Sequence, residues 1–361
     1  MCYEKIFYSE IFEETWGGIM KRQETFPFTA IIGQDDMKLA LILNVVNPKL
    51  GGVLIQGEKG TAKSTAVRAI TDLMPLRRCI VGSRYHDDPD DPAIWSDESH
   101  KLYDGKEPPV ELLPMKVVEL PVSATEDRVV GTLDIEVAIH EGKRSFEPGL
   151  LADANRNILY VDEINLLDDH VVDVLLDSAA MGVNTVEREG ISYSHPAHFS
   201  LVGTMNPEEG DIRPQLLDRF ALSVKVVGEQ NPEKRAEIIK RRLAYESDPE
   251  KFLLSWKAEQ EKETKHIEEA MTLLPKVTTS DEILLLAAKI AISLGVDGHR
   301  SDITLIKTAE TIAAVEGHSK TTKEDVRKAS RLVLPHRMRR RPFEEQVVDW
   351  SVVDKVIDDE E

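Results

Sequence analysis

One short segment constrains the fold of this chain more than any other. An apolar run at residues 53–57, VLIQG, is followed by the glycine-rich loop GEKGTAKS at 57–64 and by a helical segment from 64 to 73. A strand, a glycine loop and a helix in this order open a βαβ unit. Backbone N–H groups of such a loop converge on phosphate oxygens, and the helix N-terminus adds partial positive charge. The segment predicts a phosphate-binding P-loop; the alternative is a chance turn rich in glycine and lysine.

Each residue of this loop is a candidate for binding a nucleotide. Lys63 would reach the β and γ phosphates, and Ser64 would bind Mg²⁺. Ala62 stands where a second glycine is usual; we expect an ordinary φ there and therefore tolerance of the added methyl group. The full candidate set is Gly57, Glu58, Lys59, Gly60, Thr61, Ala62, Lys63, Ser64 and Thr65.

Two further apolar runs end in polar side chains. ILYVDE places Asp162 and Glu163 at the end of a predicted buried strand, where parallel sheets bind nucleotides. Asp162 can hold Mg²⁺, and Glu163 can orient or activate the attacking water. LVGTMN ends in Asn206, which is either a turn residue or a hydrogen-bond partner of the γ-phosphate or the water.

Two arginines are candidates for stabilising the transition state. Arg219, in LLDRF, either forms a surface salt bridge with Asp218 or serves as an arginine finger that reaches the ATP of a neighbouring subunit. Arg300, in GHRSD just before a predicted helix, is a candidate to touch the same γ-phosphate.

Composition excludes several other classes of protein. The net charge of −20 repels nucleic-acid backbones and anionic membranes, so nucleic acid is not an expected partner. Two cysteines cannot form a disulfide framework or a cysteine-based zinc module. The most apolar stretch, at 283–294, contains Lys289 and is too short to span a bilayer. We expect a protein without membrane contact, in the cytoplasm or, in a photosynthetic eukaryote, the plastid stroma.

At about 150 residues per domain, the 361 residues predict two or three domains. Residues 26–230 predict an α/β core with inserts near 84–109, 123–147 and 183–199. The second insert alternates apolar and polar residues around Glu141-Gly142, which predicts either a β-hairpin or a strand–helix insert. The third predicts two strands joined by a turn at Glu189-Gly190. Residues 231–345 predict an all-helical domain, with helical periodicity at 233–245, 250–274, 280–294, 301–316 and 322–334. We expect residues 1–25 to be an N-terminal extension and 346–361 an acidic tail.

Together these motifs resemble an AAA+ ATPase, and the resemblance narrows to the I subunit of magnesium chelatase and its cobalt-chelatase relatives. It is carried by FPFTAIIGQDDMKLAL, ATEDRVVGTLDIE, ILYVDEINLLDDHVVDVLLDSAA, NTVEREGISYSHPA and GTMNPEEGDIRPQLLDRF, and it extends from about residue 26 to 342. It implies an α/β P-loop NTPase core, built on a parallel sheet flanked by helices and carrying hairpin and helix inserts, with a C-terminal helical lid. It also implies that Ile32, Gly33 and Gln34 lie beside the adenine.

The resemblance implies ATP and Mg²⁺ as cofactors, and ATP hydrolysis that drives insertion of Mg²⁺ or a related metal into a tetrapyrrole such as protoporphyrin IX. The implied partners are other copies in a hexameric ring, a second AAA+-like subunit with an integrin-type domain, and a large porphyrin-binding subunit. Two alternatives stay open: an AAA+ protein of the helix-2-insert type that remodels another protein or a nucleic-acid complex, and a scaffold that does not hydrolyse ATP. The basic cluster HRMRRR, at 336–341, favours contact with an acidic partner or with the acidic tail.

Overall fold

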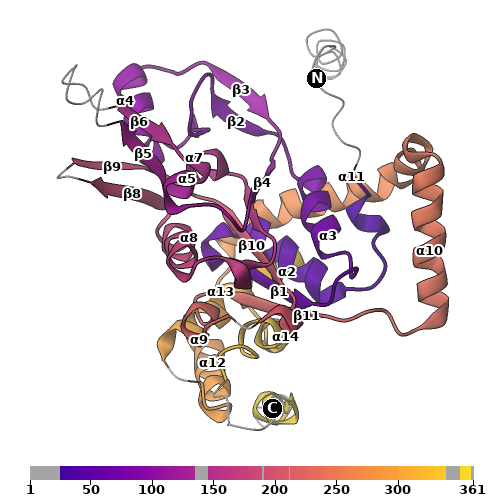
Figure 1. The fold of residues 1–361 in the computed structure, drawn as a ribbon. Helices are drawn as coiled ribbons and strands as arrows, with labels where there is room; N and C mark the ends of the chain where they lie inside the picture. Colours follow the sequence, from indigo (N-terminus) through magenta and orange to yellow (C-terminus); the bar gives the residue numbers. More distant parts are fainter. Residues whose placement is uncertain are drawn as a thin grey trace.

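The computed structural model describes residues 25–134, 145–188, 191–210, 212–296, 298–338 and 350–358. At its centre is a five-stranded parallel sheet with the order β11-β1-β10-β7-β4 (Figure 1). Its strands are β1 (Val53–Gly57), β4 (Val117–Leu120), β7 (Ile158–Val161), β10 (Ser200–Met205) and β11 (Leu222–Val226). In the described part of the chain, no helix combines the length and the hydrophobicity needed to cross a bilayer.

Both faces of the sheet are covered, which explains the continuous apolar runs of its central strands. Val53 and Ile55 of β1 pack on one face with α2 (Asp35–Val46), α3 (Lys63–Ala69) and the C-terminal helices. Leu54 packs on the other face with α5 (Glu126–Val130), α7 (Leu150–Ala154) and α8 (Asp169–Met181). The short α9 (Pro214–Leu217) lies against α8.

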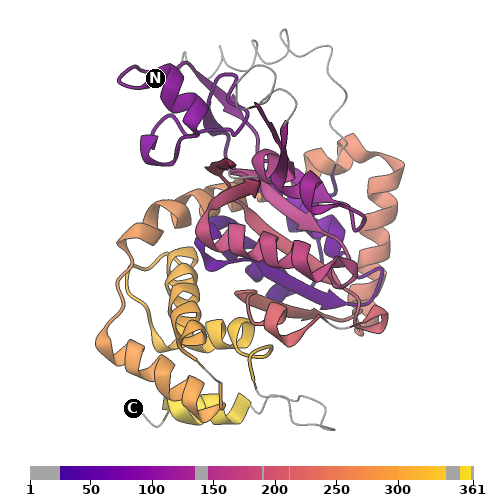
Figure 2. The ribbon, with the colours of Figure 1, turned by 60° about the vertical axis from the view of Figure 1, so that its left-hand side comes forward.

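Three inserts gather at one end of the molecule (Figures 1 and 2). The first contains the antiparallel pair β2 (Arg77–Ile80) and β3 (Val110–Leu113) and the helix α4 (Asp97–Tyr103). The second pairs β5 (Gly131–Asp134) with β6 (Ser145–Pro148), and the third pairs β8 (Val183–Arg188) with β9 (Ile191–Pro196). The strands of the predicted hairpins are therefore confirmed, while the turns at 141–142 and 189–190 lie outside the described residues.

Aromatic side chains join these inserts to one another. Tyr85, from the first insert, shares a hydrogen bond of 2.9 Å with the Tyr193 hydroxyl of β9. Phe146, from β6, stacks on the Tyr193 ring with 4.2 Å between ring centroids and 22° between planes. His195 lies 4.9 Å from the Tyr85 ring and is buried. Three segments that are far apart in the sequence therefore share one cluster.

The five predicted C-terminal helices are confirmed. They are α10 (Pro232–Ser247), α11 (Pro249–Leu273), α12 (Asp281–Ser293), α13 (His299–Val315) and α14 (Lys323–Val333). Short 3₁₀ turns occupy 28–30, 48–50, 70–73, 92–94, 164–166, 207–209 and 274–276. The extension expected at 1–25 lies outside the described residues apart from Thr25.

The end of the chain differs from the expected acidic tail. Trp350–Asp358 form helix α15, which packs on α12 and α14 and buries Val353 and Ile357. Its acidic residues Asp354 and Asp358 flank this apolar stripe and pair with Arg327 of α14. An apolar stripe within the acidic sequence therefore adds a helix to the lid.

The basic cluster at 336–341 also differs from its prediction in the part that is described. Arg337 has a side chain only 2% exposed, and its guanidinium donates to the carbonyl oxygens of Asp218, Phe220 and Ala221. His336 Nε2 lies 2.9 Å from the Phe220 carbonyl oxygen. These two residues therefore bind the segment 218–221 of their own chain, where Arg337 also pairs with Asp218. Positions 339–341 lie outside the described residues.

Candidate nucleotide-binding site

The loop after β1 depends on Gly57. β11 runs beside β1 in parallel and aligns Val226 with Gly57. A Cβ atom at position 57 would lie 2.2 Å from the Val226 carbonyl oxygen, so only glycine fits. The loop then turns through Gly60 at φ 83° into α3, which begins at Lys63.

Ala62 corrects one expectation from the sequence. Its φ is 63°, in the left-handed region, and not the ordinary value that we expected. An L-residue in this conformation costs roughly 1–2 kcal/mol, because its Cβ crowds the backbone. The position keeps the glycine-like conformation that the loop needs, although its residue is alanine.

A cavity of about 290 Å³ opens over this loop. It is lined by all the residues from 59 to 65, by Asp162 and Glu163, and by Thr204, Met205 and Asn206. Lys63 Nζ donates to the carbonyl oxygens of Gly57 and Glu58, at 2.5 and 2.7 Å. Burial lowers the pKa of Lys63, which the nearby Asp162 carboxylate partly offsets. The candidates from three separate strand ends therefore meet in one cavity.

A chain of hydroxyl groups joins the two magnesium-ligand candidates. The Tyr160 hydroxyl donates to Ser64 Oγ at 2.9 Å and lies 3.4 Å from Thr204 Oγ1. Thr204 in turn donates to Asp162 Oδ1 at 2.5 Å. Burial raises the pKa of Tyr160 to about 12, so its hydroxyl keeps its proton near neutral pH. The network fixes the Ser64 hydroxyl and the Asp162 carboxylate at the same edge of the sheet, and oxygen atoms are the ligands that Mg²⁺ prefers.

Glu163 is held beside a lysine. Lys59 Nζ lies 3.4 Å from Glu163 Oε1 and 2.5 Å from Glu209 Oε1. The hydrogen bond with Glu209, followed by the nearby charges, raises the pKa of Lys59, and the same bond lowers the pKa of Glu209. Glu163 has a φ of 53°, a strained conformation of the kind that clusters at functional sites. Asn206 is nearly buried, and its side chain accepts from the Glu208 N–H, so it also serves in a turn.

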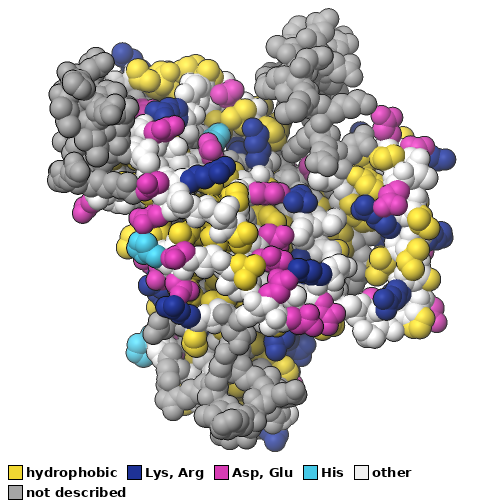
Figure 3. Space-filling model, viewed as in Figure 1, with side chains coloured by type: hydrophobic (Ala, Val, Ile, Leu, Met, Phe, Trp, Pro, Cys, Tyr) yellow, Lys and Arg dark blue, Asp and Glu magenta, His cyan; other side chains and the backbone are white. Residues whose placement is uncertain are grey.

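A second cavity of about 450 Å³ continues from the loop, sharing Gly60, Thr61, Ala62 and Thr65 with the first. Its other walls include Ile31, Ile32 and Gln34 and the face of α10 that carries Ile238 and Ile239. The remaining lining residues are Phe26, Ala30, Gly228, Glu229, Arg235, Arg241 and Arg242. Figure 3 shows apolar side chains gathered over α10. Gly33 is at φ 65°, and a Cβ there would lie 3.2 Å from Glu229 Oε2. A cavity next to a phosphate loop that offers apolar isoleucine side chains together with a few polar and charged groups suits a flat base such as adenine.

The structure does not bring the two candidate arginines into either cavity of their own chain. Arg219 pairs with Asp173 and Asp177 of α8, at 3.0 and 2.7 Å, and not with Asp218 as the salt-bridge interpretation expected. Asp218 pairs instead with Arg337. Arg300 is exposed in the first turn of α13, where its charge lowers the pKa of Arg337 as a smaller cause after burial. Both arginines therefore lie near the contact between the lid and the LLDRF segment.

Sequence reasoning missed Tyr160, Thr204 and the α10 wall. The signal for Tyr160 was present, since side chains alternate along a strand and Tyr160 therefore shares a face with Asp162. Thr204 is likewise two positions before Asn206, so the two side chains share a face of their strand. No local pattern places α10 against residues 31–34, because that contact joins segments about 200 positions apart.

Comparison with known families gives two matches. Residues 134–216 match the family described as magnesium chelatase, subunit ChlI, and residues 285–356 match the AAA lid domain. A magnesium-chelatase subunit ChlI homolog of Methanocaldococcus jannaschii is 51% identical over 94% of this chain and 93% of the relative. The ChlI subunit of Nostoc is 50% identical over 90% and 87%, and the chloroplastic ChlI subunit of Nicotiana tabacum is 49% identical over 92% and 79%.

Two solved structures resemble the whole chain. One belongs to a cryo-EM-based study of the complex between subunits BchI and BchD of magnesium chelatase; it is 44% identical, covers 93% of this chain and 100% of that one, and has a TM-score of 0.53. The other, described as a putative ATPase from Cytophaga hutchinsonii, is 15% identical with coverages of 91% and 90% and a TM-score of 0.59. The second likeness concerns the fold alone.

Proposed function

Because this chain belongs to the family of magnesium-chelatase ChlI subunits, and is an AAA+ ATPase subunit of that type, we propose that it binds and hydrolyses Mg²⁺-ATP in the two cavities described above. The observation that carries the proposal is the meeting of Lys63, Ser64, Asp162, Glu163 and Asn206 around one cavity beside the glycine loop. Family membership does not favour the alternatives of a general remodelling ATPase or a scaffold.

The loop residues bind the triphosphate in this proposal. The Lys63 ammonium exchanges the neutral carbonyl oxygens of Gly57 and Glu58 for phosphate oxygens. The contact with phosphate is the stronger one, because both partners are then charged. Ser64 and Asp162 would hold Mg²⁺, and the ion would supply positive charge opposite the β and γ phosphates. The base lies between Ile32 and the apolar face of α10.

Glu163 acts on the attacking water. Its carboxylate accepts a hydrogen bond from the water and takes its proton, while Asn206 positions the water or the γ-phosphate from the end of the neighbouring strand. Lys59 pairs with Oε1 of this carboxylate, and Oε2 is the oxygen that accepts the proton in this proposal.

Arg219 and Arg300 complete the site of a neighbouring subunit in a hexameric ring. Support comes from their positions outside the cavities of their own chain and from the family's solved relative, which is part of a complex between two subunits. In this proposal the ring drives insertion of Mg²⁺ into a tetrapyrrole by further chelatase subunits, one of them a counterpart of BchD.

Lys63→Ala and Glu163→Gln separate binding from hydrolysis. Lys63→Ala should abolish binding of a fluorescent ATP analogue. Glu163→Gln should keep binding within a few-fold of wild type and lower the rate of phosphate release by roughly 10²–10⁴-fold, the usual contribution of a general base.

A matched control is Glu119→Gln, which removes a carboxylate from the neighbouring strand β4, where it pairs with the exposed Arg68. Its turnover should stay near that of wild type. A Glu163→Gln chain that releases phosphate at the wild-type rate would show that this carboxylate is not the base.

A further inference from the structure

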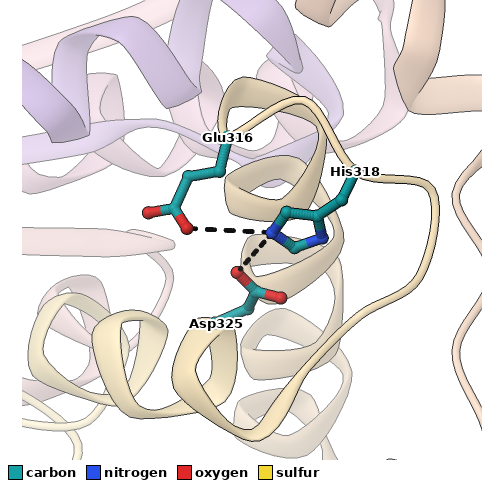
Figure 4. Close-up of side chains that lie close together, drawn as sticks. All are labelled: Glu316, His318 and Asp325. Atoms are coloured by element: carbon teal, nitrogen blue, oxygen red, sulfur yellow. Dashed lines mark ion pairs between the residues drawn. The ribbon is translucent and has the colours of Figure 1, made fainter.

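A cluster of three metal-ligand types lies in the lid, outside the nucleotide site. Glu316 ends helix α13, His318 lies in the connection that follows, and Asp325 is in the first turn of α14 (Figure 4). One ligand atom from each side chain lies within 4.8 Å of the others. The three residues thus come from the junction of two lid helices that pack closely together.

Asp325 carries an oxygen that the fold leaves without a hydrogen bond. The residue is completely buried. Its Oδ2 accepts from the backbone N–H and the hydroxyl of Thr322, both at 2.7 Å, in a capping box. Its Oδ1 is buried without a hydrogen-bond partner and faces His318 Nε2. A buried carboxylate oxygen is costly unless positive charge meets it.

His318 is oriented to supply a lone pair to the same place. Its Nδ1 lies 2.9 Å from the Lys320 carbonyl oxygen, to which it can only donate. In the neutral imidazole, Nε2 then carries the lone pair, and it points at Glu316 Oε2 and Asp325 Oδ1. A backbone carbonyl that holds the other ring nitrogen is the usual support of a metal-binding histidine. Three electron-rich atoms that face one another need a cation between them.

The spacing fits a metal ion better than a proton. His318 Nε2 is 3.5 Å from Asp325 Oδ1 and 3.7 Å from Glu316 Oε2. Charge-assisted N–H···O hydrogen bonds are shorter, about 2.7–2.9 Å. Ligands on a tetrahedral ion with bonds of about 2.0–2.2 Å are about 3.3–3.6 Å apart. Glu316 is exposed, so a small movement of its side chain brings its carboxylate oxygen to the same ligand-to-ligand distance from Asp325 Oδ1.

We propose that Glu316, His318 and Asp325 bind a divalent transition-metal ion of the zinc type, with solvent as its fourth ligand. One imidazole and two carboxylates suit zinc, whereas Mg²⁺ prefers a full set of oxygen ligands. The ion ties the end of α13 to the start of α14. Lys328 pairs with the other oxygen of Glu316 and holds that carboxylate at the site. The proposal is independent of the nucleotide site.

The test is zinc titration of the full chain. The protein is stripped with a chelator and titrated calorimetrically with ZnCl₂, without nucleotide and with excess Mg²⁺ to occupy oxygen-only sites. We expect one Zn²⁺ per chain at a site that His318→Gln and Glu316→Gln each weaken by about tenfold or more. Co²⁺ in its place should give the intense visible absorption bands of a tetrahedral ion in wild type alone.

The control is His170→Gln. His170 lies 3.2 Å from a single carboxylate, that of Glu126, and this variant should bind zinc as tightly as wild type does. Circular dichroism reports whether each variant is folded. If His318→Gln does not fold, Glu316→Gln still tests the proposal, because it alters only an exposed side chain. The proposal is overturned if wild type binds no zinc, or if the variants bind it as tightly as wild type does. The cluster would then be an ion-paired helix junction only.

Discussion

At the scale of single residues, the candidate nucleotide site contains backbone strain. Ala62 and Glu163 both have left-handed conformations, with φ of 63° and 53°, and both line the same cavity. Such conformations persist only where the surrounding structure imposes them. At position 62 the imposing elements are β1, which is fixed between β10 and β11, and α3 immediately after the loop.

Ala62→Gly should stabilise the protein. Glycine removes roughly 1–2 kcal/mol of left-handed strain. It also increases the conformational entropy of the unfolded chain, which costs about 0.4–1 kcal/mol. We expect a net gain of about 0.5–1 kcal/mol in the free energy of unfolding, measured by urea denaturation, with ATP binding retained.

The same change elsewhere gives the control. Ala258 is exposed in the interior of α11, where glycine should destabilise by about 1 kcal/mol. Opposite signs for Ala62→Gly and Ala258→Gly are the expected pattern. Equal losses at the two positions would contradict the strained conformation of Ala62.

At the scale of elements, the end of the lid holds the segment between α9 and β11. The Arg337 guanidinium donates to three carbonyl oxygens of this segment, and its Nε lies 3.4 Å from Asp218 Oδ1. Burial lowers the pKa of Arg337 to about 10, so the side chain stays charged near neutral pH. Arg219 lies between the carbonyl groups that are held. The lid therefore fixes the backbone on both sides of the candidate arginine finger.

Arg337→Met should lower the free energy of unfolding by about 3–5 kcal/mol, because several buried acceptors lose their donor at once. Turnover should fall while nucleotide binding stays, since the cavity residues are untouched. The matched control is Arg331→Met, an exposed arginine on α14, with an expected change within about 0.5 kcal/mol. Equal stability of the two variants in denaturant would refute the buried role of Arg337.

Elements were predictable from the sequence where the signals are local. The helical spans agree with the structure to about two residues because capping residues such as Asn231 and Thr322 mark their starts. The helix at 350–358 was missed because an acidic sequence hid the apolar stripe of Val353 and Ile357. The burial of Arg337 was missed for another reason: its partners lie more than 100 positions away in the sequence.

At the scale of the whole molecule, the strand order separates two groups of functional residues. Lys63, Asp162 and Asn206 meet at one edge of the sheet, because the ends of parallel strands β1, β7 and β10 lie together there. The chain then continues through α9 beside α8, which takes Arg219 away from that edge. In the proposed function, Arg219 therefore serves the site of a neighbouring subunit, and we expect catalysis to require that neighbour.

Mixing of inactive variants tests this requirement. Arg219→Ala and Lys63→Ala chains should each lack turnover, and their mixture should regain part of it. One interface then joins an intact loop to an intact arginine, whose charge stabilisation is worth about 10³–10⁵ in rate. Phosphate release is measured after mixed rings have been verified by native mass spectrometry.

The control for this mixing is the double variant Lys63→Ala/Arg219→Ala. When it is mixed with either single variant, no interface contains both an intact Lys63 and an intact Arg219, so turnover should stay absent. A mixture of the single variants that forms mixed rings and stays inactive would assign Arg219 to its ion pairs with Asp173 and Asp177.

The aromatic cluster of the inserts has a mechanical consequence. Tyr85, Phe146 and Tyr193 come from three separate excursions of the chain and are joined by a hydrogen bond and a stacked ring pair. Each insert alone would bend where it joins the core. Because their side chains are joined, the three inserts resist bending together. A force on the β8–β9 hairpin is then shared with the strands at 77–80 and 145–148. If the proposed ATP hydrolysis shifts the sheet, we therefore expect the three inserts to move with it as one unit.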